Sequence, residues 1–173
     1  MAVALLFTLS ASTSAYAQSA AAPELKAAFL LNFAKFTNWA AVQSGAEVVF
    51  CVLDDDRVGA ALTESVRGQT IEGHKLAVWK LKVDPSLPAC HLLFAPGSDA
   101  RKVLTKIGQV RDLPVLTVSN ARGFAEAGGM IELFEENGRM RFAINMDAVQ
   151  RSGVRLSSRM LDLAKIIKND HAH

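Results

Sequence analysis

The clearest structural signal in the chain is the segment Gly128-Gly129-Met130-Ile131-Glu132-Leu133-Phe134-Glu135-Glu136-Asn137-Gly138-Arg139-Met140-Arg141-Phe142-Ala143-Ile144-Asn145. Two runs rich in strand-forming residues flank Asn137-Gly138, the pair that best tolerates the positive φ angles of a type I′ turn. The sequence therefore predicts a β-hairpin. A two-residue turn fixes the register, in which Glu136 faces Arg139, Phe134 faces Arg141, Leu133 faces Phe142 and Ile131 faces Ile144.

The two faces of this hairpin differ in polarity. Ile131, Leu133, Phe142 and Ile144 share an apolar face, which is expected to be core. Two strands alone are marginally stable in water, so this face must lie on a larger sheet or on helices. The other face carries Phe134 opposite Arg141, and a covering helix or a bound partner is expected there.

The chain before the hairpin predicts the rest of the sheet. Four apolar runs of strand length occur at residues 47–53, 76–81, 90–95 and 114–119. After the first run, apolar residues recur at the spacing of a helix, and further helices are expected at about residues 99–109 and 123–127. Alternating strands and helices with short connections are typical of a mainly parallel sheet with helices on both faces. We therefore expect an α/β fold whose sheet is extended by an antiparallel hairpin, Met130 to Asn145.

A helix is predicted at the start of this unit. Pro23 and Glu24 suit a first helical turn, and Leu25, Phe29, Phe33 and Phe36 form a stripe along it. Apolar residues also occupy the other sides of this helix. It is therefore either buried under its own sheet or packed on a second subunit or partner, and Trp39 just after it belongs to the same question.

Two helices are predicted after the hairpin. Asp147 is the expected cap of a short helix at residues 148–152, which Gly153 ends. Ser157 is the expected cap of a terminal helix. The core stripe of that helix would consist of Leu156, Met160, Leu163 and Ile167.

Composition excludes several classes of protein. The 173 residues are 50% hydrophobic and 21% charged, which is ordinary for one globular domain and argues against disorder. The 19 basic and 17 acidic residues nearly balance, so the electrostatic footprint of a nucleic-acid-binding protein is missing.

The first residues are typical of an export signal. A short apolar run precedes small residues that end in Ala15-Tyr16-Ala17, which predicts cleavage after Ala17. A membrane anchor is the alternative, but the run is well below the ~20 residues that span a bilayer. We expect a signal peptide at 1–17, a flexible leader at 18–22 and a single α/β domain at 23–170, located in an extracytoplasmic space.

Cys51 and Cys90 are the only cysteines. In an oxidising compartment such a pair is more often a disulfide than two free thiols. The two residues fall in the first and third apolar runs, so a bridge requires those strands to be neighbours. A zinc site with His74 or His91 is disfavoured because no metal-ligand spacing repeats.

No catalytic set, cofactor motif or metal motif emerges. Asp54, Asp55 and Asp56 follow a predicted strand, where ligand sites of α/β sheets occur, but helix capping explains them more simply. A phosphotransfer or Mg²⁺ site would need a second acid cluster at later strand ends, to which Ser98 and Asp99, then Ser119 and Asn120, give only a weak match. The dinucleotide fingerprint is absent because no Gly-rich turn follows the first strand.

Positive charge concentrates in the last third of the chain. Arg151, Arg155 and Arg159, with Arg139 and Arg141 of the hairpin, could hold a carboxylate, a phosphate or an acidic partner surface. The alternative is a solvated face, because Gly153 breaks any continuous helical register.

Several motifs in one order resemble the YfiR family. They are Leu25-Lys26-Ala27-Ala28-Phe29-Leu30-Leu31-Asn32-Phe33-Ala34-Lys35-Phe36-Thr37-Asn38-Trp39, Cys90-His91-Leu92-Leu93-Phe94, Pro114-Val115-Leu116-Thr117-Val118-Ser119, Gly128-Gly129-Met130-Ile131, Arg141-Phe142-Ala143-Ile144-Asn145 and Leu156-Ser157-Ser158. The resemblance covers about residues 24–168. It implies a periplasmic α/β protein that represses a membrane-bound, YfiN-like diguanylate cyclase by contacting the cyclase's periplasmic part.

The same resemblance implies further partners, and the chain departs from the family pattern at one point. It implies release of repression by a YfiB-like outer-membrane lipoprotein, a homodimer, and redox-sensitive disulfides. Cys51 and Cys90 match one cysteine pair of the family, whereas the second pair is missing here. Candidate partner or dimer contacts lie on the first and terminal helices: Phe29, Phe33, Phe36, Trp39, Leu163 and Ile167.

The sequence therefore leads to a non-enzymatic regulator of cyclic di-GMP and biofilm formation as the first hypothesis. A periplasmic small-molecule binding or sensor protein, with its site in the crevice at the strand ends, is the second. An enzyme built on Asp54 to Asp56 is a third hypothesis, which loss of activity in an Asp54→Asn variant would be needed to support.

Overall fold

A computed structural model describes residues 23–39, 42–82 and 89–168. The predicted signal peptide and leader lie outside the described residues. The elements are α1 (Pro23–Lys35), β1 (Val48–Leu53), α2 (Asp56–Val66), β2 (Thr70–Ile71), β3 (His74–Leu81), β4 (Leu92–Phe94), α3 (Ala100–Lys106), a 3-10 turn η1 (Gly108–Val110), β5 (Leu116–Ser119), β6 (Ile131–Glu136), β7 (Arg139–Asn145), α4 (Met146–Ser152), α5 (Ser158–Asp162) and β8 (Lys165–Ile167).

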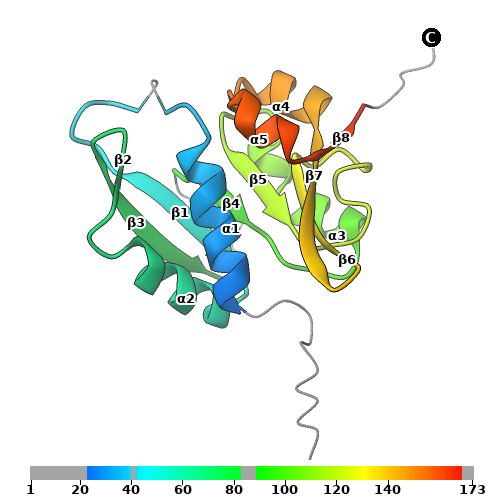
Figure 1. The fold of residues 1–173 in the computed structure, drawn as a ribbon, viewed down its shortest axis with the longest axis horizontal. Coiled ribbons are helices and arrows are strands. Elements are labelled where there is room, and N and C mark those ends of the chain that lie inside the picture. Colours follow the sequence, from blue (N-terminus) through cyan, green and yellow to red (C-terminus); the bar gives the residue numbers. More distant parts are fainter. Residues whose placement is uncertain (1–22, 40–41, 83–88, 169–173) are drawn as a thin grey trace, which may run out of the picture.

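The strands form one sheet in the order β2-β3-β1-β4-β5-β6-β7-β8 (Figure 1). Strands β3, β1, β4, β5 and β6 run parallel to one another, whereas β6 and β7 form the antiparallel hairpin. The predicted α/β fold, with a mainly parallel sheet extended by a hairpin, is confirmed.

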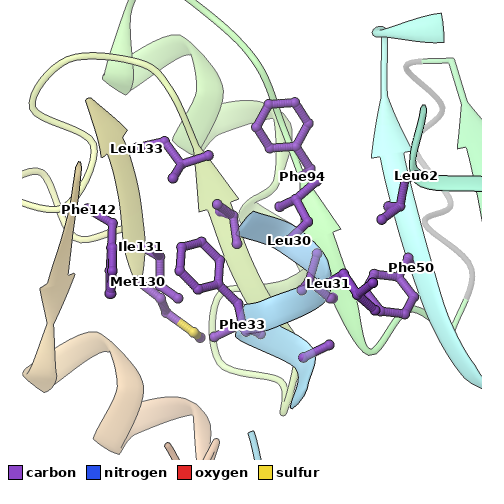
Figure 2. Packing of buried hydrophobic residues seen from close by; sticks show 14 of the residues in the cluster. Leu30, Leu31, Phe33, Phe50, Leu62, Phe94, Met130, Ile131, Leu133 and Phe142 are labelled. Atoms are coloured by element: carbon purple, nitrogen blue, oxygen red, sulfur yellow. The ribbon is translucent and has the colours of Figure 1, made fainter. Parts of the chain in front are cut away.

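Helices cover both faces of the first part of the sheet. On one face α1 crosses the middle of the sheet, with α2 on one side of it and α4 and α5 toward the other (Figure 1). A large apolar cluster fills this layer, and Leu30, Leu31 and Phe33 of α1 lie between Phe50 of β1 and the hairpin residues (Figure 2). On the opposite face, α3 and the turn at residues 121–125 cover a second cluster.

The hairpin has the predicted register. All the expected pairs form, from Ile131 with Ile144 to Glu136 with Arg139. Asn137 and Gly138 have φ angles of 52° and 70°, as a type I′ turn requires. Ile131, Leu133, Phe142 and Ile144 are buried in the large cluster, so the apolar face is core as predicted.

The predicted terminal helix is wrong in its second half. The Ser157 hydroxyl accepts a hydrogen bond from Met160 N and starts α5 as expected, but α5 ends at Asp162. Residues Lys165–Ile167 instead form β8, which pairs in parallel with Ala143–Asn145 of β7. The helix predicted from the apolar stripe does not continue, because the neighbouring edge of β7 offers main-chain hydrogen-bond partners to a segment with two β-branched residues.

Two smaller predictions also needed correction, and one short strand was not predicted. Residues 123–127 form turns rather than a helix, since Gly123 and Gly128 both have positive φ. Asn145, and not Asp147, caps α4 by accepting a hydrogen bond from Ala148 N. The short strand β2, which is antiparallel to β3, has no sequence signal that distinguishes it from a turn.

Candidate functional site

One face of the sheet is left open at the β6-β7-β8 end. On the face that α3 covers farther along the sheet, a hollow of about 650 Å³ lies between the 120–126 segment and β8. Strand register places Glu132, Phe134, Ala143 and Lys165 on this same face. The lining residues are Asn120, Arg122, Gly123, Glu126, Glu132, Leu133, Phe134, Glu135, Ala143, Lys165 and Ile167. The predicted cover over Phe134 and Arg141 is therefore not a helix of the described chain.

Glu132 fixes one wall of the hollow. Its side chain is largely buried, with 8% of the residue exposed. One carboxylate oxygen accepts a hydrogen bond from Gly123 N (3.0 Å) and the other accepts one from Ala125 N (3.1 Å). Asn145 Nδ2 also donates to the Ala125 carbonyl (2.6 Å). These bonds attach the 121–127 turn to the hairpin, so the shape of the hollow is built into the fold.

Gly129 explains why two glycines precede the hairpin. A Cβ atom on Gly129 would overlap the ring of Phe124, which is fully buried. The missing side chain lets the turn close against β6. The sequence showed the glycine pair, but only the structure identifies the ring that requires it.

Charged and polar groups in the hollow are available to an occupant. Arg122 and Lys165 bring positive charge, whereas Glu126 and Glu135 bring negative charge, and none of the four forms an ion pair within the described ranges. Asn120 Oδ1 is buried and has no hydrogen-bond partner among the described residues. A buried acceptor without a partner costs free energy, so this oxygen is suited to a ligand donor.

The candidate partner-contact residues have different exposures. Phe33 and Trp39 are 2% and 4% exposed, and the Trp39 Nε1 donates to the Ala34 carbonyl. Phe29 is half-buried and packs edge-to-face on Phe33 and Phe142. The packing interpretation of α1 thus accounts for Phe33 and Trp39. Phe36 and Ile167 are half-buried, whereas Leu163 is 68% exposed.

The predicted arginine cluster is exposed to solvent. Arg151, Arg155 and Arg159 all lie on the surface, and the Arg155 carbonyl accepts a hydrogen bond from Asn38 N. These arginines do not line the hollow. Binding of an anion by these three residues stays a prediction.

The predicted disulfide is present. Cys51 of β1 and Cys90 before β4 are bridged, with a Cα–Cα distance of 5.8 Å. β1 and β4 are neighbours, as the bridge required.

His91 lies beside the disulfide and holds β1 and the β4 segment together. Its Nδ1 accepts a hydrogen bond from Val49 N (3.0 Å), and its ring meets Trp39 edge-on. Burial, and secondarily the nearby His74, lower the pKa of His91 below its usual value. The neutral ring is therefore the form that the fold selects.

The aspartates after β1 serve local structure. The Asp55 carboxylate caps α2 by accepting from Val58 N, as the capping interpretation predicted. Asp54 and Asp56 form exposed ion pairs with Lys106 (3.5 Å) and Lys82 (3.4 Å). Among the described residues, no group of three or more His, Cys, Asp or Glu side chains is placed to hold a metal ion. Nor does the described part contain a helix long and apolar enough to cross a membrane.

The fold and the hollow define an α/β domain whose sheet is open at one end, and comparisons with known proteins place this chain in a family. The model of the YfiR/HmsC-like family matches residues 23–165, and the chain belongs to this family. A search of curated proteins gave no match. A solved structure described as a conserved domain protein from Vibrio cholerae O1 biovar El Tor strain N16961 has a TM-score of 0.50 over 85% of this chain, at 11% identity. This chain spans 60% of that protein's length, and the likeness shows the fold alone.

Proposed function

We propose that this protein is a non-enzymatic periplasmic regulator that represses a membrane-bound diguanylate cyclase. It would do so by binding the cyclase's periplasmic region, and it would thereby control cyclic di-GMP and biofilm formation. The observation that carries this proposal is the match to the YfiR/HmsC-like family over residues 23–165. A regulator of this kind acts only if it binds the inactive cyclase more tightly than the active one.

Two structural features support the proposal. The Cys51–Cys90 disulfide suits an oxidising, extracytoplasmic compartment. The open β6-β7-β8 end of the sheet offers a charged and partly apolar surface to another protein. A YfiN-like cyclase is the proposed target, a YfiB-like outer-membrane lipoprotein is the proposed antagonist, and a homodimer is the proposed assembly.

Deletion of the gene in the native host tests this function. Loss of the repressor should raise cellular cyclic di-GMP and biofilm, because the cyclase is no longer held inactive. Both should return to their starting levels when the wild-type gene is restored. Unchanged cyclic di-GMP in a deletion strain that produces the cognate cyclase would refute the proposal.

A second candidate function is a small-molecule sensor. The hollow of about 650 Å³ favours it, as does the Asn120 oxygen at the end of β5, which has no hydrogen-bond partner among the described residues. A thermal-shift screen of polar metabolites against the purified protein tests it. A ligand of this hollow should stabilise the wild type, and Asn120→Leu should abolish that stabilisation, whereas a shift unaffected by Asn120→Leu would place the ligand elsewhere.

A further inference from the structure

The outer edge of β7 is paired along only part of its length. β7 runs from Arg139 to Asn145, but β8 pairs only with Ala143–Asn145. Within the described ranges, no strand lies beyond the first residues of β7, and the hairpin runs past β8 in Figure 1. Arg139–Phe142 therefore forms a free strand edge, here called the β7 edge.

Hairpin geometry determines which backbone groups this edge presents. The turn at Asn137-Gly138 makes Glu136 and Arg139 the pair that exchanges main-chain hydrogen bonds. In an antiparallel ladder the next pair does not exchange such bonds, so the N–H and C=O of Met140 point away from β6. Met140 thus presents both main-chain groups to an incoming strand.

A recess lies along the β7 edge. It has a volume of about 290 Å³, and Asp162–Ala164, just before β8, forms its far side. Leu163, 68% exposed, lies in it and is the most exposed large apolar side chain among the described residues. The remaining lining residues are Phe134, Glu136, Arg141, Phe142 and Lys165. An apolar side chain of an added strand would find contact area here.

Charge selects the kind of strand that fits. Arg139 and Arg141 are exposed, share one face of β7, and form no ion pair in the described part of the chain. The recess itself is lined by two cations and two acids, Arg141, Lys165, Glu136 and Asp162, so the positive excess lies along β7 and not in the recess. Acidic side chains at alternate positions of an added strand would lie opposite the two arginines.

A second copy of this chain fits the edge poorly. Antiparallel pairing of two β7 edges about Met140 would place Arg139 of each copy directly opposite Arg141 of the other. Like charges at directly opposed positions destabilise a strand pair, and charged edges are a known protection against self-association. The β7 edge therefore favours a different protein.

We propose that the β7 edge is a docking strand for an extended segment of a partner protein in which acidic and apolar residues alternate. The inference deepens the proposed function and rests on it for the partner's identity, which is then the periplasmic region of the cyclase. Docking adds a strand to the sheet through Met140, places acids on Arg139 and Arg141, and places an apolar side chain on Leu163.

Two variants test the edge by different means. Met140→Pro removes the outward N–H, and edge strands tolerate proline where the N–H faces solvent. Arg141→Glu reverses one charge and keeps the main chain. Arg101→Glu, at an exposed position on α3, is the matched control. Hydrogen exchange of the β6-β7 amides reports whether each variant keeps the hairpin.

Binding is measured with two probes, the purified periplasmic region of the cognate cyclase and a synthetic peptide of alternating Glu and Val. Met140→Pro and Arg141→Glu should each weaken both interactions about tenfold or more, with Arg101→Glu close to wild type. A peptide of alternating Lys and Val should bind the wild type more weakly than the Glu peptide.

The outcomes separate this inference from the proposed function. If both variants bind the cyclase region as tightly as the wild type, the proposal that the β7 edge is a docking strand is overturned. The proposed function is not affected by that outcome. If the wild type does not bind the cyclase region, the proposed function fails. Binding of the Glu-Val peptide then tests by itself whether the β7 edge accepts an added strand. Saturable binding of the Glu-Val peptide by the wild type, lost in both variants, supports docking at the β7 edge. If the wild type does not bind the peptide, docking at this edge is overturned. Sedimentation showing a wild-type dimer that Met140→Pro dissociates would also overturn it, in favour of a second copy.

Discussion

Strands β1 and β6 lie in one sheet but in different surroundings. All six residues of β1 are buried, because α1 and α2 cover one face and α3 covers the other. β6 is buried only at its start and becomes exposed toward the turn. The same difference is visible in the sequence, as an unbroken apolar run in β1 and as alternation in β6.

The difference between the surroundings of β1 and β6 separates the region that stabilises the fold from the region that is accessible to a partner. The part of the sheet that helices cover on both faces, around β1 and β4, is the two-sided part; it holds the disulfide and the second cluster, whereas the large cluster also continues under the hairpin. The one-sided part holds the hollow and the β7 edge, where polar groups and main-chain groups remain accessible. Substitutions at positions covered by helices should therefore affect unfolding, whereas those on the open face and at the β7 edge should affect binding, and four measurements test this contrast.

The largest effect is expected at the disulfide. Replacing Cys51 and Cys90 by Ala removes a bridge across a sequence separation of 39 residues. The chain-entropy model gives a loss of about 4 kcal/mol in the free energy of unfolding. Urea denaturation measures it, and dithiothreitol should lower the stability of the wild type but not that of the variant. Equal stability of the two proteins without reductant would show that the bridge does not stabilise the two-sided part.

The next largest effect is a difference in unfolding free energy between two neighbouring residues that lie on opposite faces of β6. Leu133 is buried in the large cluster, so Leu133→Ala should cost about 2 to 5 kcal/mol in the free energy of unfolding. Phe134 is only half-buried at the open face, so Phe134→Ala should cost about 1 kcal/mol or less. Denaturant titration of both variants compares the faces directly. Equal losses would mean that the open face is covered in solution.

A smaller loss is expected at Gly129, where the two parts of the sheet meet. Gly129→Ala forces a methyl group against the buried Phe124 ring and should cost about 1 to 3 kcal/mol in the free energy of unfolding. Gly108→Ala is the matched control, since a Cβ there meets nothing within 4 Å. Thermal unfolding of both variants is the measurement, and a Gly129→Ala protein as stable as the control would contradict the packing argument.

The smallest effect is a pH dependence within the two-sided part. The pKa of His91 is lower in the folded protein than the 6.5 of the free side chain, chiefly through burial. The unfolded chain then binds the proton more readily. The stabilisation is complete above pH 6.5 and is lost as the pH falls from there through the lowered pKa.

Urea denaturation between pH 5 and pH 8 would measure this slope. His91→Asn keeps a side-chain acceptor for Val49 N but cannot titrate, so its stability should change less over the same range. An identical slope in wild type and variant would assign the pH dependence to another group.

Much of the fold could be predicted from local pattern. The hairpin register followed from Asn137-Gly138 and from alternation, and the adjacency of β1 and β4 followed from the position of two cysteines. The second half of the terminal helix could not be predicted this way. Its apolar spacing fits a helix, and the edge of β7 that turns residues 165–167 into a strand is distant in sequence.

The candidate site was less visible in the sequence. Asn120 carried a weak signal because it follows a strand, and Glu132 could have been noticed as an acid between apolar residues of a strand. Neither signal indicates a hollow. Its walls come from the 120–126 segment, β6, β7 and β8, and only their packing shows that no helix of the described chain covers Phe134.

Local sequence was enough to predict the alternation of strands and helices, the hairpin with its register, the apolar faces and the cysteine pair. These features depend on local dihedral preferences and on a periodicity of burial that a short window contains. Three features follow from the packing of distant segments: residues 165–167 form a strand, the sheet is open at β6-β7-β8, and Met140 lies on an edge that no other described strand pairs with. Each of these depends on which distant segment supplies, or fails to supply, the neighbouring hydrogen-bond partners and apolar contacts.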